Sequence, residues 1–450
     1  MALLVACQKQ DDWLNEKSAK SDVVPETLAD FQAILDNTME MNQRCFTNTG
    51  IVASDNIQVP TEKLSEIYEF EKNIYLWDRN VWEAGNSREW NYGFRVIEFA
   101  NYILEELKEA KGTETQKNSI EGQARFFRAI AMYSLTQLFC TAYQENTADT
   151  DLGLPIRESS DVNKIIRHRS SMKQTFGFIV ADLQRAISLL PSTQLYFQRP
   201  TTIGAKGLLS KIYLLMGDYP TALEYSEQVL ATQNQLLDFN NTSIINYNSD
   251  NRFPYHGVGN PEIIFYGDCI SYSSGSPTTL SLAIADPELY DMYDSQDLRK
   301  ILFFTLRDNQ QCFAGTYNGD YQNFSGIATN EVLLIKAECE ARRGSIANAM
   351  NDLNLLLTHR YKTGTFIPLT ANNAEDALSK VLRERRKELP MTGNVRWEDL
   401  KRLNHDPRFQ KTISRNVNGS TITLPPNDKR YVFPIPENEI KASGIEQNDL

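Results

Sequence analysis

The chain has 450 residues, of which 41% are hydrophobic and 23% are charged, and its formal net charge at pH 7 is −12. Beyond the N-terminus it has no run of 18 or more apolar residues, which excludes a membrane-spanning helix there. Nucleic acid is excluded as a partner, because phosphate neutralisation needs clustered Lys and Arg, and the main basic cluster at 383–387 is interleaved with glutamates.

The first residues have the form of a lipoprotein anchor. Leu4-Val5-Ala6-Cys7 matches a lipobox, in which a small residue precedes a cysteine that is acylated after cleavage. We therefore expect residues 1–20 to hold a truncated signal, the lipidated Cys7 and a polar tether. The alternative is a chance hydrophobic tetrad before a free cysteine.

From about residue 88 the spacing of apolar residues predicts one helix after another and a mainly α fold. In 205–222 an apolar helix reaches Gly217, turns, and continues with Ala222 on the inner face of a second helix. Residues 331–349 repeat this spacing around Gly344. Glycine permits the tight turn, so both stretches predict tetratricopeptide-like helical pairs.

Two further pairs are predicted, 120–141 with 172–190 and 375–389 with 396–403. The segment between the pairs, about 233–329, is rich in Asn, Tyr, Ser and Gly, and we expect a ligand there. These observations predict a single domain over 21–450, with helical pairs at about 119–232 and 330–405 and a loop-rich insertion at about 233–329.

The charged residues near the C-terminal end alternate in sign at helical spacing. We interpret them as an ionic network that ties two helices together, with Trp397 as a core anchor. The residues concerned are Glu384, Arg385, Glu388, Arg396 and Asp399.

Motifs of catalysis and of cofactor binding are absent from the sequence. It has no G-x-S-x-G, HExxH, G-x-G-x-x-G or phosphate-binding glycine loop, and no C-x-x-C. The four histidines are dispersed, so no metal site and no cofactor are expected. A pair of carboxylates could still meet in space without a sequence signature, which leaves a glycan-processing enzyme as an alternative.

A series of short motifs in order along the chain resembles the SusD/RagB family. The long helix Glu121-Gly-Gln-Ala-Arg125 is followed by Gly153-Leu-Pro155, and the middle section carries Asn260-Pro-Glu262 and Asp286-Pro-Glu288. The C-terminal part adds Arg396-Trp397, Phe433-Pro-Ile-Pro436 and Gln447-Asn448. The sequence departs from the family pattern at Thr392-Gly393-Asn394, where the family commonly has Glu before the glycine.

This resemblance implies a lipid-anchored protein on the outside of the outer membrane that captures a nutrient and delivers it to a SusC-like TonB-dependent transporter. It further implies an oligosaccharide ligand or, as in RagB-like proteins, a peptide, and no catalysis. A tetratricopeptide adaptor that binds only proteins is a further alternative.

The resemblance also places the ligand site in loops before the first long helix and in the middle insertion. Aromatic plates can stack on sugar rings while polar side chains bind the hydroxyls. The residues expected by position are Trp77, Trp82, Asn86, Arg88, Tyr255, Tyr272, Tyr317, Tyr321 and Asn323.

Overall fold

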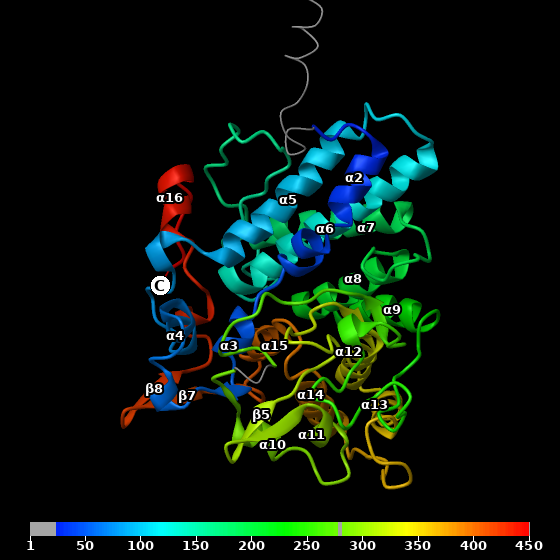
Figure 1. Ribbon diagram of the computed structural model, residues 1–450, viewed down its shortest axis with the longest axis vertical. Coiled ribbons are helices and arrows are strands. Elements are labelled where there is room, and N and C mark those ends of the chain that lie inside the picture. Colours follow the sequence, from blue (N-terminus) through cyan, green and yellow to red (C-terminus); the bar gives the residue numbers. More distant parts are fainter. Residues whose placement is uncertain (1–23, 278–280, 450) are drawn as a thin grey trace, which may run out of the picture.

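The computed structural model describes residues 24–277 and 281–449 (Figure 1). Most of the regular structure is helical, and the strands are short. The predicted mainly α, tetratricopeptide-like fold is confirmed. Cys7 and the tether predicted at 1–20 lie outside the described residues.

Antiparallel helices that pack side by side form the scaffold. In the first half of the chain, each of these helices packs on the next one. They are α5 (Arg88–Glu106), α6 (Glu114–Phe139), α7 (Met172–Leu189), α8 (Thr202–Met216) and α9 (Tyr219–Leu230). The second half continues the array through contacts of α12 with α8 and α9. It comprises α12 (Thr329–Arg342), α13 (Ile346–Thr358), α14 (Ala374–Glu388) and α15 (Val395–Leu403).

The turns inside the pairs have the predicted cause. Gly217 has φ 78°, a left-handed conformation, and ends α8 before Asp218 caps α9 by accepting a hydrogen bond from the backbone N–H of Thr221. Gly344 has φ 86° between α12 and α13. A glycine is thus required at both turns.

The insertion between α9 and α12 folds against the helices as short strands and turns. Among the described residues, antiparallel ladders pair β2 with β6 and β4 with β5 within the insertion, β1 with β3 between the N-terminal part and the insertion, and β7 with β8 near the C-terminal end. The strands are β1 (Ile57–Gln58), β2 (Ile263–Phe265), β3 (Ile284–Ala285), β4 (Phe304–Arg307), β5 (Gln310–Phe313), β6 (Ile327–Ala328), β7 (Ile413–Val417) and β8 (Ser420–Leu424).

Short helices complete the fold around the array. They are α2 (Leu28–Leu35), the π-helix η2 (Met39–Gln43), α3 (Thr49–Ala53), α4 (Glu69–Tyr75), α10 (Pro287–Tyr290), α11 (Arg299–Leu302) and α16 (Glu437–Ser443), with 3-10 turns η3 (Thr61–Lys63), η4 (Glu83–Gly85), η5 (Tyr255–Gly257) and η6 (Lys429–Tyr431). None of the described helices is long and apolar enough to cross a lipid bilayer.

The predicted ionic network is present and buried. Arg385 pairs with Asp399 at 2.9 Å and with Glu331 at 2.9 Å, while Glu388 pairs with Arg299 at 3.1 Å. Trp397 is fully buried, as predicted for a core anchor. The network therefore joins α12, α14 and α15 with the start of α11.

The N-terminal part of the chain is locked against the C-terminal part. Asp55 forms ion pairs with Arg396 at 2.7 Å, Lys411 at 2.9 Å and Arg386 at 3.1 Å. The Asn56 side chain donates to the carbonyl of Pro390 at 2.8 Å. Segments more than 300 residues apart in sequence thus share one core.

Candidate functional site

The structure corrects the sequence-based assignment of Trp77, Tyr272, Tyr317 and Asn323, because all four are buried. Trp77 donates from Nε1 to the carbonyl of Ala53 at 2.9 Å. A ligand at the surface cannot reach these side chains, so they stabilise the fold.

Buried acids accept hydrogen bonds from two of these side chains. The Tyr272 hydroxyl donates to Glu89, and the Tyr317 hydroxyl donates to Glu262 at 2.5 Å. Asn323 donates instead to the carbonyl of Gly275. The two tyrosine hydroxyls and the Asn323 amide nitrogen are thus already used inside the protein.

The early loop places its remaining residues at or near the surface. Trp82 is partly buried, packs against Phe139 and Phe433, and donates to the carbonyl of Pro434 at 2.7 Å. Asn86 and Arg88 are exposed. Their contact with a ligand stays a prediction.

The insertion exposes the other two predicted tyrosines, Tyr255 by 64% and Tyr321 by 53%. Next to Tyr255, the Nδ1 of His256 lies 3.0 Å from the Tyr266 hydroxyl, which donates to Asp268 at 3.0 Å. Their role in binding a ligand also stays a prediction.

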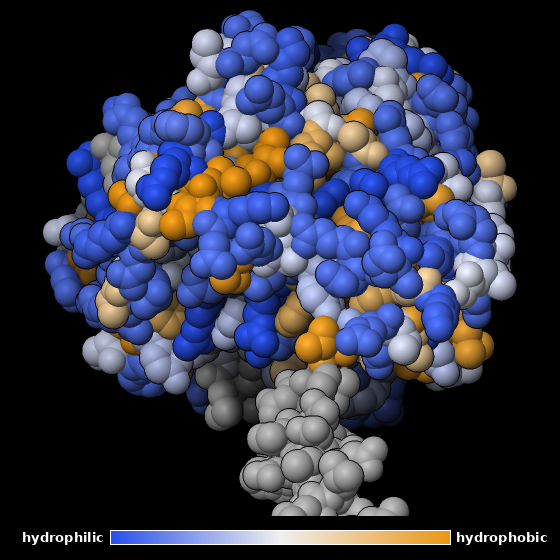
Figure 2. All heavy atoms as spheres, turned by 90° about the horizontal axis from the view of Figure 1, so that it is seen from above, coloured by the Kyte–Doolittle hydropathy of each residue, from blue (hydrophilic) through white to orange (hydrophobic). Residues whose placement is uncertain are grey.

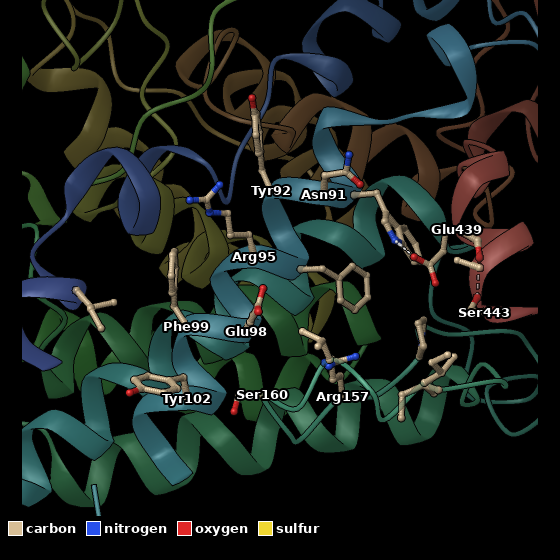
Figure 3. Close-up of a pocket in the computed structure, with 18 of the residues that line it drawn as sticks. Asn91, Tyr92, Arg95, Glu98, Phe99, Tyr102, Arg157, Ser160, Glu439 and Ser443 are labelled. Atoms are coloured by element: carbon tan, nitrogen blue, oxygen red, sulfur yellow. Dashed lines mark hydrogen bonds between the residues drawn. The ribbon is translucent and has the colours of Figure 1, made fainter. Parts of the chain in front are cut away.

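A large concavity lies elsewhere, along the outward face of α5 (Figure 3). It is a groove of about 990 Å³ between α5, the loop at 155–166 and α16. Aromatic rings line much of it, contributed by Trp90, Tyr92, Phe94, Phe99 and Tyr102. We call it the α5 groove.

Helical spacing explains why these rings form a row. Tyr92, Phe99 and Tyr102 recur at near-integral turns, so they share one face of α5 over about 15 Å. The face of the same helix that packs into the core includes Ile97 and Ala100. The rings thus lie on the outward side of α5 among polar residues.

Arginines hold two of these rings in place. The Arg44 guanidinium lies 4.8 Å from the centre of the Tyr92 ring, and Arg95 lies 5.5 Å from the centre of Phe99. Glu40 pairs with both arginines, at 2.6 Å to Arg44 and 3.3 Å to Arg95. The rings are therefore oriented before any ligand arrives.

Polar groups beside the rings keep free hydrogen-bonding capacity. The side chains of Asn91 and Glu98 and the Tyr92 hydroxyl form no hydrogen bond to any other residue that the structure describes. Arg95 is half exposed and uses Nε for its ion pair. Figure 3 shows all four of these residues on the same stretch of helix.

The walls of the groove are fixed to its floor. Trp90 donates from Nε1 to Glu439 of α16 at 3.3 Å, and the Tyr102 hydroxyl donates to the carbonyl of Pro25 at 2.8 Å. In the loop, Arg157 donates to the carbonyls of Ser159 at 2.9 Å and Asp161 at 2.6 Å. The groove is thus preformed.

The surrounding surface also has apolar character. Seen from above, one face of the molecule carries an elongated band of hydrophobic residues between hydrophilic neighbours (Figure 2). In the loop that walls the α5 groove, Val162 and Ile165 are exposed. A row of rings with uncommitted polar groups beside it can stack on sugar rings and bind their hydroxyls.

Sequence reasoning missed the α5 groove. None of the aromatic residues that line this groove was among the predicted ligand contacts. The available signal was the aromatic content of the outward helix face, at positions where a surface helix usually carries charged residues.

Comparisons with known proteins agree with this fold. Residues 12–214 match the family model described as "Starch-binding associating with outer membrane", and residues 245–450 match the model described as "SusD family". The chain is 24% identical over 418 residues to SusD-like protein P2 of Formosa agariphila, which covers 80% of this chain and 79% of that protein.

Solved structures share the architecture. A putative sugar binding protein from Bacteroides vulgatus superposes with a TM-score of 0.74 at 21% identity, covering 94% of this chain and 98% of that one. A laminarin binding SusD-like protein gives a TM-score of 0.66 at 17% identity, covering 93% and 97%. At these identities the likeness shows a common fold.

Proposed function

Because the chain belongs to the SusD family, we propose that it is a cell-surface glycan-binding lipoprotein that captures an oligosaccharide and delivers it to a SusC-like TonB-dependent transporter. Lipidation of Cys7 would anchor it to the outer membrane. The protein binds its ligand and performs no reaction on it.

The observation that carries the binding part is the α5 groove. Its volume of about 990 Å³ is at the upper end of the range for ligand sites, which suits an oligosaccharide more than a single sugar. Tyr92 and Phe99 supply stacking faces, and Asn91, Arg95 and Glu98 supply donors and acceptors for hydroxyl groups. Preformed walls lower the ordering cost of binding.

Calorimetry against a panel of oligosaccharides and oligopeptides tests this proposal. We expect saturable binding of an oligosaccharide to the protein without Cys7, with no change in the sugar, and a loss in Tyr92→Ala. Tyr196→Ala is the matched control, because Tyr196 is exposed outside the groove and, like Tyr92, lies under an arginine, here Arg199 at 5.4 Å.

Other outcomes of the panel have distinct meanings. Binding that falls in Tyr255→Ala or Tyr321→Ala, but not in Tyr92→Ala, would move the glycan site to the insertion. Binding of oligopeptides alone would replace the glycan by a peptide, as in RagB-like proteins. Turnover of a glycan would contradict the proposal that the protein is not an enzyme.

Delivery needs a separate test. We expect the lipidated protein to co-purify with its transporter, and uptake of the ligand to fall when the protein is deleted and to remain low with a Cys7→Ala variant. Normal uptake in the deletion strain would refute the transport role while leaving ligand binding intact.

A further inference from the structure

The α5 groove carries a carboxylate within its row of aromatic rings. Trp90, Phe94, Glu98 and Tyr102 recur every four residues along α5, and all four line the groove. Glu98 therefore occupies the place of a ring between Phe94 and Tyr102, about 6 Å along the helix axis from each. Figure 3 shows Glu98 in the middle of this stretch of helix.

The Glu98 side chain is partly buried and has no partner inside the protein. In the part of the chain that the structure describes, its carboxylate forms no hydrogen bond and no ion pair. A carboxylate that loses water on burial is normally given donors or a cation in return. A ligand in the groove can supply the donors that Glu98 lacks.

The other carboxylate of the lining, Glu439 on α16, also lacks a cation. It accepts a hydrogen bond from Nε1 of Trp90 at 3.3 Å, but no basic nitrogen lies within 4.0 Å of it among residues 24–277 and 281–449. Two uncompensated carboxylates thus line one wall and the floor of the groove.

Further carboxylates surround the end of the groove where Tyr102 lies. Burial raises the pKa of the Tyr102 hydroxyl, and the charges of Glu106, Glu26 and Asp30 raise it further. These charges oppose the formation of a tyrosinate there. They oppose a negative charge on a ligand at this end for the same reason.

The basic residues among the described lining, Arg95 and Arg157, are already engaged. Arg157 donates to the carbonyls of Ser159 at 2.9 Å and Asp161 at 2.6 Å, so its guanidinium is directed at the loop backbone. Arg95 lies 3.3 Å from Glu40, which compensates its charge while its terminal nitrogens can still donate to hydroxyls.

We propose that Glu98 restricts the α5 groove to uncharged oligosaccharides, because its carboxylate accepts hydrogen bonds from sugar hydroxyls and repels glycans that carry carboxylate groups. This inference rests on the proposed function, since it concerns the same groove. The two oxygens of a carboxylate can accept from adjacent hydroxyls of one sugar while the flanking rings stack on the chain. An acidic sugar would instead place a second uncompensated charge beside the first.

Calorimetry on the protein lacking Cys7 compares cellohexaose, laminarihexaose and maltohexaose with the same chains oxidised at C6 to uronates. The two members of a pair differ in a hydroxymethyl group against a carboxylate. We expect neutral chains to bind at least about tenfold more tightly than their oxidised forms.

The outcomes separate this inference from the function on which it rests. Oxidised chains that bind as tightly as neutral ones, with a loss in Tyr92→Ala, would overturn the role of Glu98 and leave glycan capture intact. If no chain of either series binds, the inference falls together with the proposed function.

Glu98→Gln is the sharpest variant, because it keeps the shape of the side chain, removes its charge and breaks no contact within the described structure. We expect affinity for the neutral chain to fall about fivefold, the value of one hydrogen bond, and affinity for the oxidised chain to rise. Glu109→Gln is the matched control. Glu109 is exposed just beyond α5, forms no ion pair with any described residue and does not line the groove.

The control is expected to keep the preference of the wild type for neutral chains. An unchanged preference in Glu98→Gln, or an equal change in Glu109→Gln, contradicts the proposal. Thermal unfolding of both variants checks that the fold is preserved.

Ionic strength gives a second readout, which a purely structural role of Glu98 would not affect. Salt screens repulsion between charges, so the preference of the wild type is expected to narrow between about 20 mM and about 500 mM NaCl. In Glu98→Gln we expect a smaller change. A wild-type preference that is independent of salt would mean that shape excludes the oxidised chains, and the proposal would be wrong.

Discussion

At the scale of single residues, the local sequence does not show which aromatic side chains are buried and which are exposed. Tyr255 and Tyr272 both stand in polar, glycine-containing surroundings, yet Tyr255 is exposed and Tyr272 is buried. The difference depends on Glu89, which lies 183 residues earlier in the sequence and accepts a hydrogen bond from the Tyr272 hydroxyl. A partner that is so distant in the sequence leaves no local pattern. Nothing in the sequence around Tyr272 could therefore have shown that its side chain is buried.

The α5 groove yields a prediction for one ring. Phe99→Ala removes a stacking face beneath Arg95 without touching the core face of α5, so we expect oligosaccharide affinity to fall about tenfold, roughly 1.4 kcal/mol. Calorimetry with the best oligosaccharide of the panel measures this, with Tyr196→Ala as control. Equal affinities of wild type and Phe99→Ala would show that the ring makes no ligand contact.

Asp268 predicts a pH-dependent stability. Burial raises its pKa from 3.8 to about 7. Between these values the folded state keeps a proton that the unfolded chain has released, so this group makes stability fall as the pH rises from about 4 to 7. Asp268→Asn stays neutral, and we expect it to gain about 2–3 kcal/mol relative to wild type between pH 5 and pH 8.

Urea unfolding at the two pH values measures that gain. Asp320 and His256 are the neighbouring groups that bear on Asp268, and the variant leaves both in place. A difference between variant and wild type that is the same at pH 5 and pH 8 would mean that Asp268 is already ionised in the folded protein at pH 5.

At the scale of elements, the helical pairs were predictable because their signals are local. The predicted pair in 205–222 forms α8 and α9, and that in 331–349 forms α12 and α13. The glycine at the turn and the spacing of apolar residues can both be recognised within a stretch of about 20 residues. The short strands of the insertion were not predicted, because β2 pairs with β6 across some 60 residues and neither strand exceeds three residues.

Two glycines of the insertion allow a matched test of its packing. Gly319 and Gly259 both have positive φ, 65° and 85°. A Cβ at Gly319 would collide with the carbonyl oxygens of Phe253 and Pro254, whereas one at Gly259 would meet open space. We expect Gly259→Ala to cost about 1 kcal/mol of unfolding free energy and Gly319→Ala at least about 2 kcal/mol more.

Chemical denaturation of both variants measures the difference between them, which isolates the collision from the backbone strain that they share. Equal losses of unfolding free energy would show that the backbone around Gly319 moves to accommodate a Cβ at little cost, and that this turn does not hold the insertion in place.

At the scale of the whole molecule, the two family models divide the chain near residues 214–245, but the fold does not divide there. The first half supplies Asp55, and the second half supplies the cations around it. Burial alone would raise the pKa of Asp55, but Arg396 and Arg386 hold it well below its usual value. Its stabilising effect is therefore present above about pH 4 and is lost as the pH falls through the folded-state pKa.

Asp55→Asn tests how strongly this contact joins the halves. It leaves Arg386, Arg396 and Lys411 without their shared counter-charge, so we expect a loss of about 3–5 kcal/mol at pH 7. Glu66→Gln, which breaks an exposed pair with Lys63, is the control and is expected to cost less than about 1 kcal/mol. Thermal unfolding at pH 7 compares them.

The interlocking of the two ends also governs how the protein is made. Gly50 donates to the Asn394 side chain at 2.9 Å, so a ribosome has added more than 340 residues before the first of these groups meets the second. Contacts of such high contact order form late and slowly. A chain that lacks either segment cannot form these contacts, so we expect each half expressed alone to be less stable than the whole chain.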